Sequence, residues 1–168
     1  MSMIGKFVRV TENELQNYIS DSLLFENLLD DEAFDEGQNV CDIDKTWDAI
    51  SYLLTGYGPS DLNNAKPPIS WTIFGSSVLD ENQDLGYGPG NYLTVEQVAL
   101  VNAELSKISL KDLMVNYNAD KMNDLGLYPN SWGKPEDEMD YIGNHFESLK
   151  IFYLTAAANE QAVICYLS

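Results

Sequence analysis

The chain has 168 residues and carries 27 acidic side chains against nine basic ones, a formal net charge of −18. So large an excess of carboxylates repels phosphate groups, because nucleic-acid binding depends on Lys and Arg that displace condensed counterions. We therefore expect neither a nucleic acid nor an anionic membrane as a partner. Hydrophobic residues make up 45% of the sequence, which is enough for a packed core. Length and composition predict one compact α+β domain over residues 1–168.

Apolar stretches and cysteine usage indicate the cellular compartment in which we expect the protein. The N-terminal residues lack the apolar run of a signal peptide, and no stretch approaches the roughly 20 apolar residues of a membrane span. We expect a cytoplasmic protein. Cys41 and Cys165 lie far apart among apolar neighbours, which favours buried free thiols over a disulfide or a metal site.

The first third of the chain predicts a strand followed by two helices. Residues 3–10 are short and rich in apolar types, which is typical of a strand. Thr11 and Glu14 form a capping box, and apolar residues follow it at helical spacing: Leu15, Tyr18, Ile19 and Leu23. The acid-rich segment 30–36 predicts a solvated loop. A second helix is indicated by apolar residues spaced four, three and four apart, namely Ile43, Trp47, Ile50 and Leu54. Gly56 is its expected C-terminal cap.

The remainder predicts a long irregular segment, more helices and a final strand. Residues 57–90 hold four of the six prolines, so we expect turns there, with a short element over 69–74. Thr94 and Gln97 open a helix with Val98, Val101, Leu105 and Ile108 on one face, and Ser109 with Asp112 suggests another start. The longest helix should cover 136–158, with an apolar stripe of Met139, Ile142, Phe146, Leu149 and Tyr153. The apolar run 162–167 predicts a strand covered on both faces that pairs with the N-terminal strand. The fold class is a helix-rich α+β domain with a small sheet that includes both terminal strands.

The segment Asp42–Asp48 is the first candidate site. Asp44 suits the N-cap position of the helix that follows, and Asp48 is placed to pair with Lys45 or to face solvent. Alternatively, carboxylates beside Trp47 could bind a cation or act as acid and base.

The segment that ends in a glycine-rich loop is the second candidate. Residues 80–91 match a calcium loop only in part, because Leu85 stands at the position of the required glycine and Asn91 at that of the bidentate Glu. A phosphate-binding loop is excluded, since residues 86–92 contain no Lys or Arg. The loop can instead present tyrosines to a small molecule or a peptide. The candidate contact residues of both segments are Asp42, Asp44, Lys45, Trp47, Asp48, Asp84, Tyr87 and Tyr92. With His145 as the only histidine, we expect no metal, no cofactor and no familiar nucleophile triad.

Several of these segments resemble the YfbM-like family of bacterial domains of unknown function. The most specific is the Asp-Ile-Asp-Lys-Thr-Trp-Asp run at 42–48, followed by Tyr-Leu-Leu-Thr-Gly at 52–56; others are at 3–5, 73–75, 84–89, 92–94, 128–129 and 141–153. The resemblance spans nearly the whole chain and implies an α+β fold without an established activity, substrate or cofactor. Many relatives look to have a histidine where this chain has Ser51, and an Ala-Arg pair where it has Gly90 and Asn91. The departure weakens an enzymatic interpretation of this chain.

Two hypotheses about function remain open at the level of sequence. The leading one is a non-enzymatic binding module whose acidic face meets a basic protein, as an immunity or regulatory protein for a bacterial toxin. The alternative is an enzyme or small-ligand binder, with its site where the Asp42–Asp48 segment meets the Gly86–Tyr92 loop. The sequence does not fix the oligomeric state.

Overall fold

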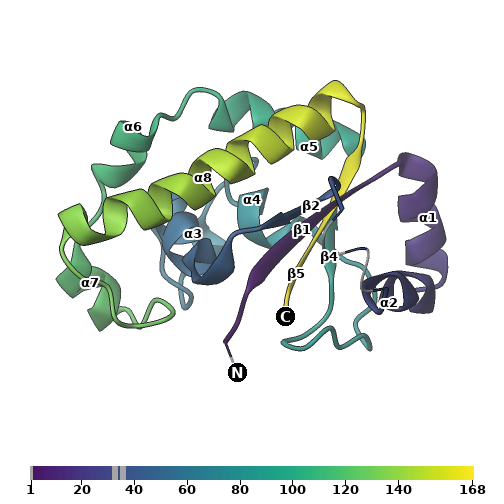
Figure 1. Cartoon of the computed structure of the whole chain (residues 1–168), viewed down its shortest axis with the longest axis horizontal. Helices are drawn as coiled ribbons and strands as arrows, with labels where there is room; N and C mark the ends of the chain where they lie inside the picture. Colours follow the sequence, from purple (N-terminus) through teal and green to yellow (C-terminus); the bar gives the residue numbers. More distant parts are fainter. Residues whose placement is uncertain (1, 32–33, 35–36) are drawn as a thin grey trace.

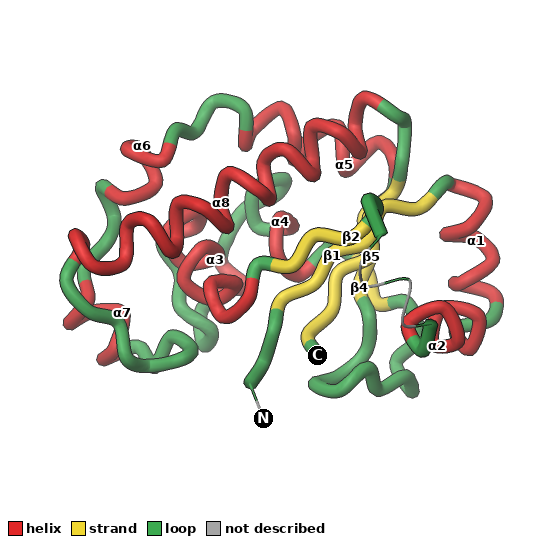
Figure 2. Tube along the Cα trace, in the orientation of Figure 1, coloured by secondary structure: helices red, strands yellow, loops and turns green. Residues whose placement is uncertain are grey.

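A five-stranded sheet with helices on both faces organises the structure (Figures 1 and 2), a computed structural model that describes residues 2–31, 34 and 37–168. Its strands are β1 (Gly5–Val10), β2 (Val40–Asp42), β3 (Ser77–Val78), β4 (Asn91–Leu93) and β5 (Ala162–Leu167). Its α-helices are α1 (Glu12–Ser20), α2 (Leu23–Leu29), α3 (Trp47–Thr55), α4 (Trp71–Phe74), α5 (Val95–Leu105), α6 (Leu110–Met114), α7 (Ala119–Asp124) and α8 (Pro135–Ala158). Two short 3-10 turns are η1 (Asp44–Thr46) and η2 (Leu62–Asn64). The α+β class predicted from the sequence is confirmed.

The C-terminal strand β5 lies in the middle of the sheet. The strand order is β2-β1-β5-β4-β3, and all four pairings are antiparallel. β1 and β5 pair along their full lengths, from Gly5 opposite Leu167 to Val10 opposite Ala162. The predicted pairing of the two terminal strands is therefore confirmed, and both ends of the chain lie near one another (Figure 1).

The two faces of β1 and β5 belong to two different hydrophobic clusters. Phe7 and Cys165 face the larger cluster, which includes α3, α5 and α8, whereas Val8 and Ile164 face a smaller one beneath α1 and α2. Because successive side chains of a strand point to opposite faces, a strand covered on both faces has to be apolar throughout. This accounts for the unbroken apolar run at the end of the sequence.

The predicted helix signals are largely confirmed. Both Thr capping boxes form, Ser109 caps α6, and Gly56 ends α3 with a left-handed φ of 79°. The long helix α8 begins at Pro135 and ends at Ala158, with most of its predicted stripe buried. Met139 is an exception, because it is 42% exposed in the first turns of α8. None of the helices in the described ranges combines the length and the apolar character needed to cross a membrane.

The chain departs from the predictions after α1 and after α5. A single helix through Leu23 was predicted, but α1 ends at Ser20 because Asp21 adopts an extended conformation, and its side chain accepts a hydrogen bond from the Leu23 backbone N–H. In the separate helix α2, Phe25 is buried instead of Leu23, which is 60% exposed. Ile108 lies beyond the end of α5. The predicted loop at 30–36 includes residues 32–33 and 35–36, which lie outside the described residues.

The burial of α8 generates a prediction about stability. Phe146 is 0% exposed at the centre of the larger cluster, so Phe146→Ala should lower the free energy of unfolding by about 3–5 kcal/mol. The control is Val115→Ala, at a side chain that is 76% exposed, where a change within about 0.5 kcal/mol is expected. Urea denaturation followed by circular dichroism measures both, and similar values for the two variants would contradict the placement of the core.

Candidate functional site

The carboxylates before α3 connect neighbouring elements and do not cap that helix. The turn η1 separates Asp44 from α3, which corrects the predicted N-cap role; the N-cap position belongs to Thr46 and has no side-chain hydrogen bond. Instead, Asp44 Oδ2 accepts a hydrogen bond of 2.8 Å from the Tyr141 hydroxyl of α8. Asp42 Oδ1 accepts one of 2.7 Å from the Asp44 backbone N–H, and Asp42 lines a depression between β2 and α8. Lys45 is half-buried in the same turn.

Asp48 is buried, contrary to the expectation that it pairs with Lys45 or faces solvent. Its side chain is 5% exposed, and its Oδ2 accepts a hydrogen bond of 2.8 Å from the Tyr128 backbone N–H. Burial raises the pKa of Asp48, and the hydrogen bond from Tyr128 opposes part of that rise. The carboxyl group therefore joins α3 to the segment before α8, although its removal from water disfavours the charged form.

Trp47 holds the N-terminal residues against the same segment. Its indole Nε1 donates to the Met3 carbonyl oxygen at 3.1 Å, and the Met3 N–H donates to the Tyr128 hydroxyl at 3.0 Å. The Trp47 ring stacks on Tyr128 at 5.6 Å and meets Phe74 edge-on at 5.9 Å. A Cβ on Gly5 would lie 2.8 Å from the Trp47 Cβ, so β1 can pass beneath the indole only with glycine at that position.

A cavity of about 290 Å³, called here the Trp47 cavity, lies between α3 and the segment that follows it. Asp48 and Ser51 are its polar residues from α3; their spacing of three places them on neighbouring parts of one helix face. The other residues that line it are Trp47, Tyr57, Gly58, Pro59, Leu62, Phe74 and Leu167. The Trp47 cavity is thus largely apolar, and Asp48 supplies the one carboxyl group among its described lining residues.

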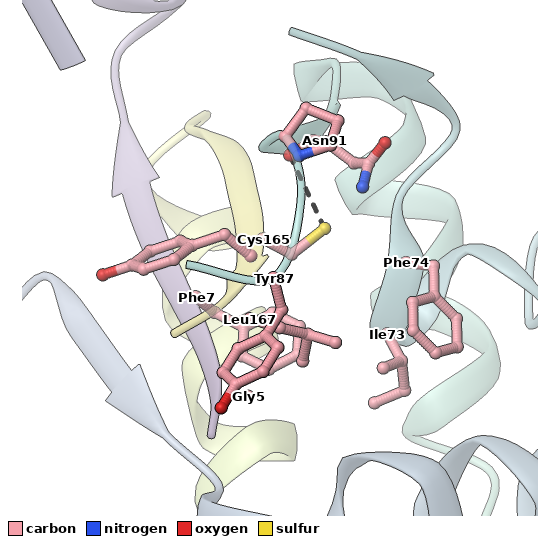
Figure 3. A pocket seen from close by; sticks show the side chains of 10 residues that line it. Gly5, Phe7, Ile73, Phe74, Tyr87, Asn91, Cys165 and Leu167 are labelled. Atoms are coloured by element: carbon pink, nitrogen blue, oxygen red, sulfur yellow. Dashed lines mark hydrogen bonds between the residues drawn. The ribbon is translucent and has the colours of Figure 1, made fainter. Parts of the chain in front are cut away.

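A second cavity of about 250 Å³, called here the Tyr87 cavity, lies between α4 and the face of the sheet (Figure 3). The strand register aligns Phe7, Cys165 and Asn91 in one row across β1, β5 and β4, so all three side chains point to this face. Ile73 and Phe74 lie opposite the strand residues in Figure 3. The remaining residues that line the cavity are Gly5, Tyr87, Pro89, Tyr166 and Leu167.

The Cys165 thiol in the Tyr87 cavity is not activated. It is 2% exposed and donates to the Asn91 carbonyl oxygen at 3.6 Å (Figure 3). Burial raises its pKa to about 12, so the thiol stays protonated at neutral pH and is a poor nucleophile. Cys41 is also a buried free thiol, and burial raises its pKa to about 12. The predicted state of both cysteines is confirmed.

The glycine-rich loop is held in place by Asp84. Its Oδ1 accepts from the backbone N–H groups of Gly86 at 3.0 Å and Gly88 at 3.2 Å, and these bonds lower the pKa of Asp84. Both glycines have positive φ angles, 123° and 103°, which side-chain-bearing residues rarely adopt. The loop places Tyr87 beside Leu167, where the Tyr87 N–H donates to the Leu167 carbonyl oxygen at 3.3 Å.

The eight predicted contact residues are thus divided among several places. Trp47 and Asp48 line one cavity and Tyr87 lines the other, and both cavities are bounded by Phe74 and Leu167. Tyr92 lies opposite Ile164 and packs against the cluster under α1 and α2, on the other face of the sheet. The other five do not line either cavity: Asp42, Asp44, Lys45, Asp84 and Tyr92.

Sequence reasoning missed several residues of the site. Tyr57, Leu62 and Phe74 come from the segment predicted as mostly irregular, where no periodicity indicates which side chains converge. The family resemblance offered one signal: Ser51 and Asn91, two positions where it implies a departure from the pattern of many relatives, each line one of the cavities. Among the residues that the structure describes, no group of three or more His, Cys, Asp or Glu is arranged to hold a metal ion.

The raised pKa of Asp48 generates a prediction about pH. Folding raises the pKa of Asp48, so the carboxyl group contributes stability to the native state at pH values below the ordinary pKa of an Asp side chain. This contribution is lost as the pH rises through the raised pKa. Asparagine cannot ionise but can accept the same hydrogen bond. Asp48→Asn should therefore gain stability over the wild type as pH rises, by about 1.4 kcal/mol per unit of pKa shift. Thermal melts between acidic and neutral pH measure this, with exposed Asp61→Asn as control; a difference that does not vary with pH would contradict it.

Comparisons with known proteins agree with this architecture. A family model described as a domain of unknown function (DUF1877) matches residues 1–166. The crystal structure of YfbM from Escherichia coli, a protein of unknown function, is similar with a TM-score of 0.73 and 18% sequence identity, covering 99% of this chain and 100% of that chain. At this identity the likeness shows the fold alone. No curated protein is significantly similar to the chain. Because the family model spans nearly all of its residues, the chain belongs to the DUF1877 family of YfbM-like domains.

Proposed function

We propose that this chain is a small-ligand-binding protein whose site is the pair of cavities on either side of Phe74 and Leu167. The observation that carries the proposal is the Asp48 carboxyl group, buried at the wall of a largely apolar cavity of about 290 Å³. Ligand sites are typically concave and mostly apolar, with a few polar groups that fix orientation. The size of each cavity suits a small molecule.

The groups that line the cavities support binding in preference to nucleophilic catalysis. The Cys165 thiol has a pKa of about 12, and His145 lies on α8 with its ring against Tyr141, 5.2 Å away. Asp48 could serve as a base, but no described histidine, cysteine or second carboxylate lines the Trp47 cavity with it. Binding requires only the convergence of apolar walls and one polar anchor, which these residues provide.

A cavity-filling variant tests the proposal. Ser51→Leu should occupy part of the Trp47 cavity and abolish the binding of small-molecule fragments detected by NMR, whereas Ser131→Leu, at an exposed site away from both cavities, should not. Backbone amide shifts in the wild type should change around Ser51, Gly58 and Phe74. A fragment screen without hits at these residues, or with hits that Ser51→Leu leaves unchanged, would sink the proposal.

A second candidate function is the recognition of a basic protein, such as a toxin for which the chain acts as an immunity or regulatory protein. The observation that favours it is the distribution of charge: no Lys or Arg occurs between Arg9 and Lys45, where the sequence carries eleven carboxylates. The described part of this stretch includes α1 and α2, with Leu23 60% and Leu24 46% exposed. Carboxylates around exposed apolar side chains speed encounter with a positive surface and leave an apolar contact to hold it.

Charge-matched variants test the second candidate. One variant converts Glu12, Glu14, Asp21 and Asp30 to their amides, and its control converts Asp124, Glu136, Asp137 and Asp140, so that both have the same net charge. A partner captured from the native host and then purified should bind the first variant at least about tenfold more weakly than the control in calorimetry. Its affinity for the wild type should fall between roughly 0.05 and 0.5 M salt. Equal weakening by both variants, or affinity independent of salt, would refute recognition by α1 and α2.

A further inference from the structure

We infer that the Trp47 cavity binds a small organic cation, with an alkylammonium group beside the Asp48 carboxylate and its alkyl substituents against the aromatic side chains. This inference rests on the proposed ligand-binding function and names the class of ligand. It adds the charge of the ligand and the residues that select it.

The buried Asp48 carboxyl group favours a cationic ligand. The Tyr128 N–H holds Oδ2 and fixes the orientation of the carboxyl group, while a carboxylate has acceptor sites on both oxygens. The described residues that line the cavity include no Lys, Arg or His. A carboxylate buried without a cation is unfavourable, as the raised pKa of Asp48 reflects. A cationic ligand would supply the missing charge from within the cavity.

The aromatic side chains that line the cavity also favour a cation. Trp47, Tyr57 and Phe74 line the cavity from three separate segments of the chain. Cations are attracted to the faces of aromatic rings, most strongly to Trp, and this attraction suits methylated ammonium groups that shed water readily. The Trp47 indole is already held by its hydrogen bond to Met3 and by its contact with Tyr128, so little ordering is required on binding.

The charge of the protein and the size of the cavity further restrict the class of ligand. The net charge of −18 repels anions and raises the local concentration of cations. A metal ion would need several oxygen ligands, whereas Asp48 is the one carboxylate among the described residues that line this largely apolar cavity. A volume of about 290 Å³ suits a ligand with a short alkyl chain and excludes a peptide helix.

Two probes of equal shape test the inference. Choline carries a trimethylammonium group, and 3,3-dimethylbutan-1-ol replaces its nitrogen with carbon and so removes the charge. Choline should bind at least about tenfold more tightly, with amide shifts at Trp47, Asp48 and Ser51 in NMR titrations. Its affinity should rise with pH through the titration of Asp48, whereas that of the neutral alcohol should not change.

Variants assign the effect to the named residues. Asp48→Asn should weaken choline at least about tenfold and leave the neutral alcohol unchanged, while Asp61→Asn, which removes an exposed charge from the segment after α3, should alter choline less than about twofold. Tyr57→Ala, at a side chain 39% exposed, is a second variant whose fold should tolerate the change, and it should also weaken choline.

The outcomes separate this inference from the proposed function. Equal binding of both probes would overturn the cation inference and leave a ligand site in place. Binding of library fragments without binding of choline would likewise overturn the ligand class alone. The absence of binding by either probe and by every fragment would overturn the cation inference and the proposed function together.

Discussion

The antiparallel pairing of β5 with β1 is the constraint on which the rest of the structure depends. It joins the two ends of the chain, and it creates a central strand whose alternate side chains enter two separate hydrophobic clusters. The helices α3, α5 and α8 contribute to one cluster and α1 with α2 to the other, so both depend on the same six residues of β5. Both cavities also lie at the end of this strand, where Leu167 forms a wall of each.

The junction around Trp47 connects this sheet to the helical part. Met3, Trp47, Asp48 and Tyr128 are linked by hydrogen bonds and by ring stacking, although they come from parts of the chain up to 125 residues apart. The junction uses a buried carboxyl group in place of an apolar residue. An ionisable group at that place is unfavourable for stability, and its presence beside a cavity is the observation behind the proposed ligand site.

The two candidate functions use opposite sides of the sheet. The cavities lie on the face that carries α3 and α4, whereas α1 and α2 cover the other face (Figure 1). Gln83 is a structural link between them: it accepts from Gly90 N–H in the loop and donates to the Ser22 carbonyl oxygen at the start of α2. The two candidate sites are made of different residues, so both could be present in one molecule.

The sequence by itself determined the elements with strong local signals. Capping boxes, the apolar stripe of α8 and the apolar run of β5 depend on contacts within a few residues or on a simple periodicity, so they could be predicted for α1, α5, α8 and both terminal strands. Only the tertiary structure decided the roles of the carboxylates, because Asp44 and Asp48 are suited by type to capping and solvent contact but find partners in Tyr141 and Tyr128, about 80 to 97 residues away. It also decided which side chains line the cavities, since Tyr57, Leu62 and Phe74 lie in a segment without periodicity and meet at one cavity only in the folded chain.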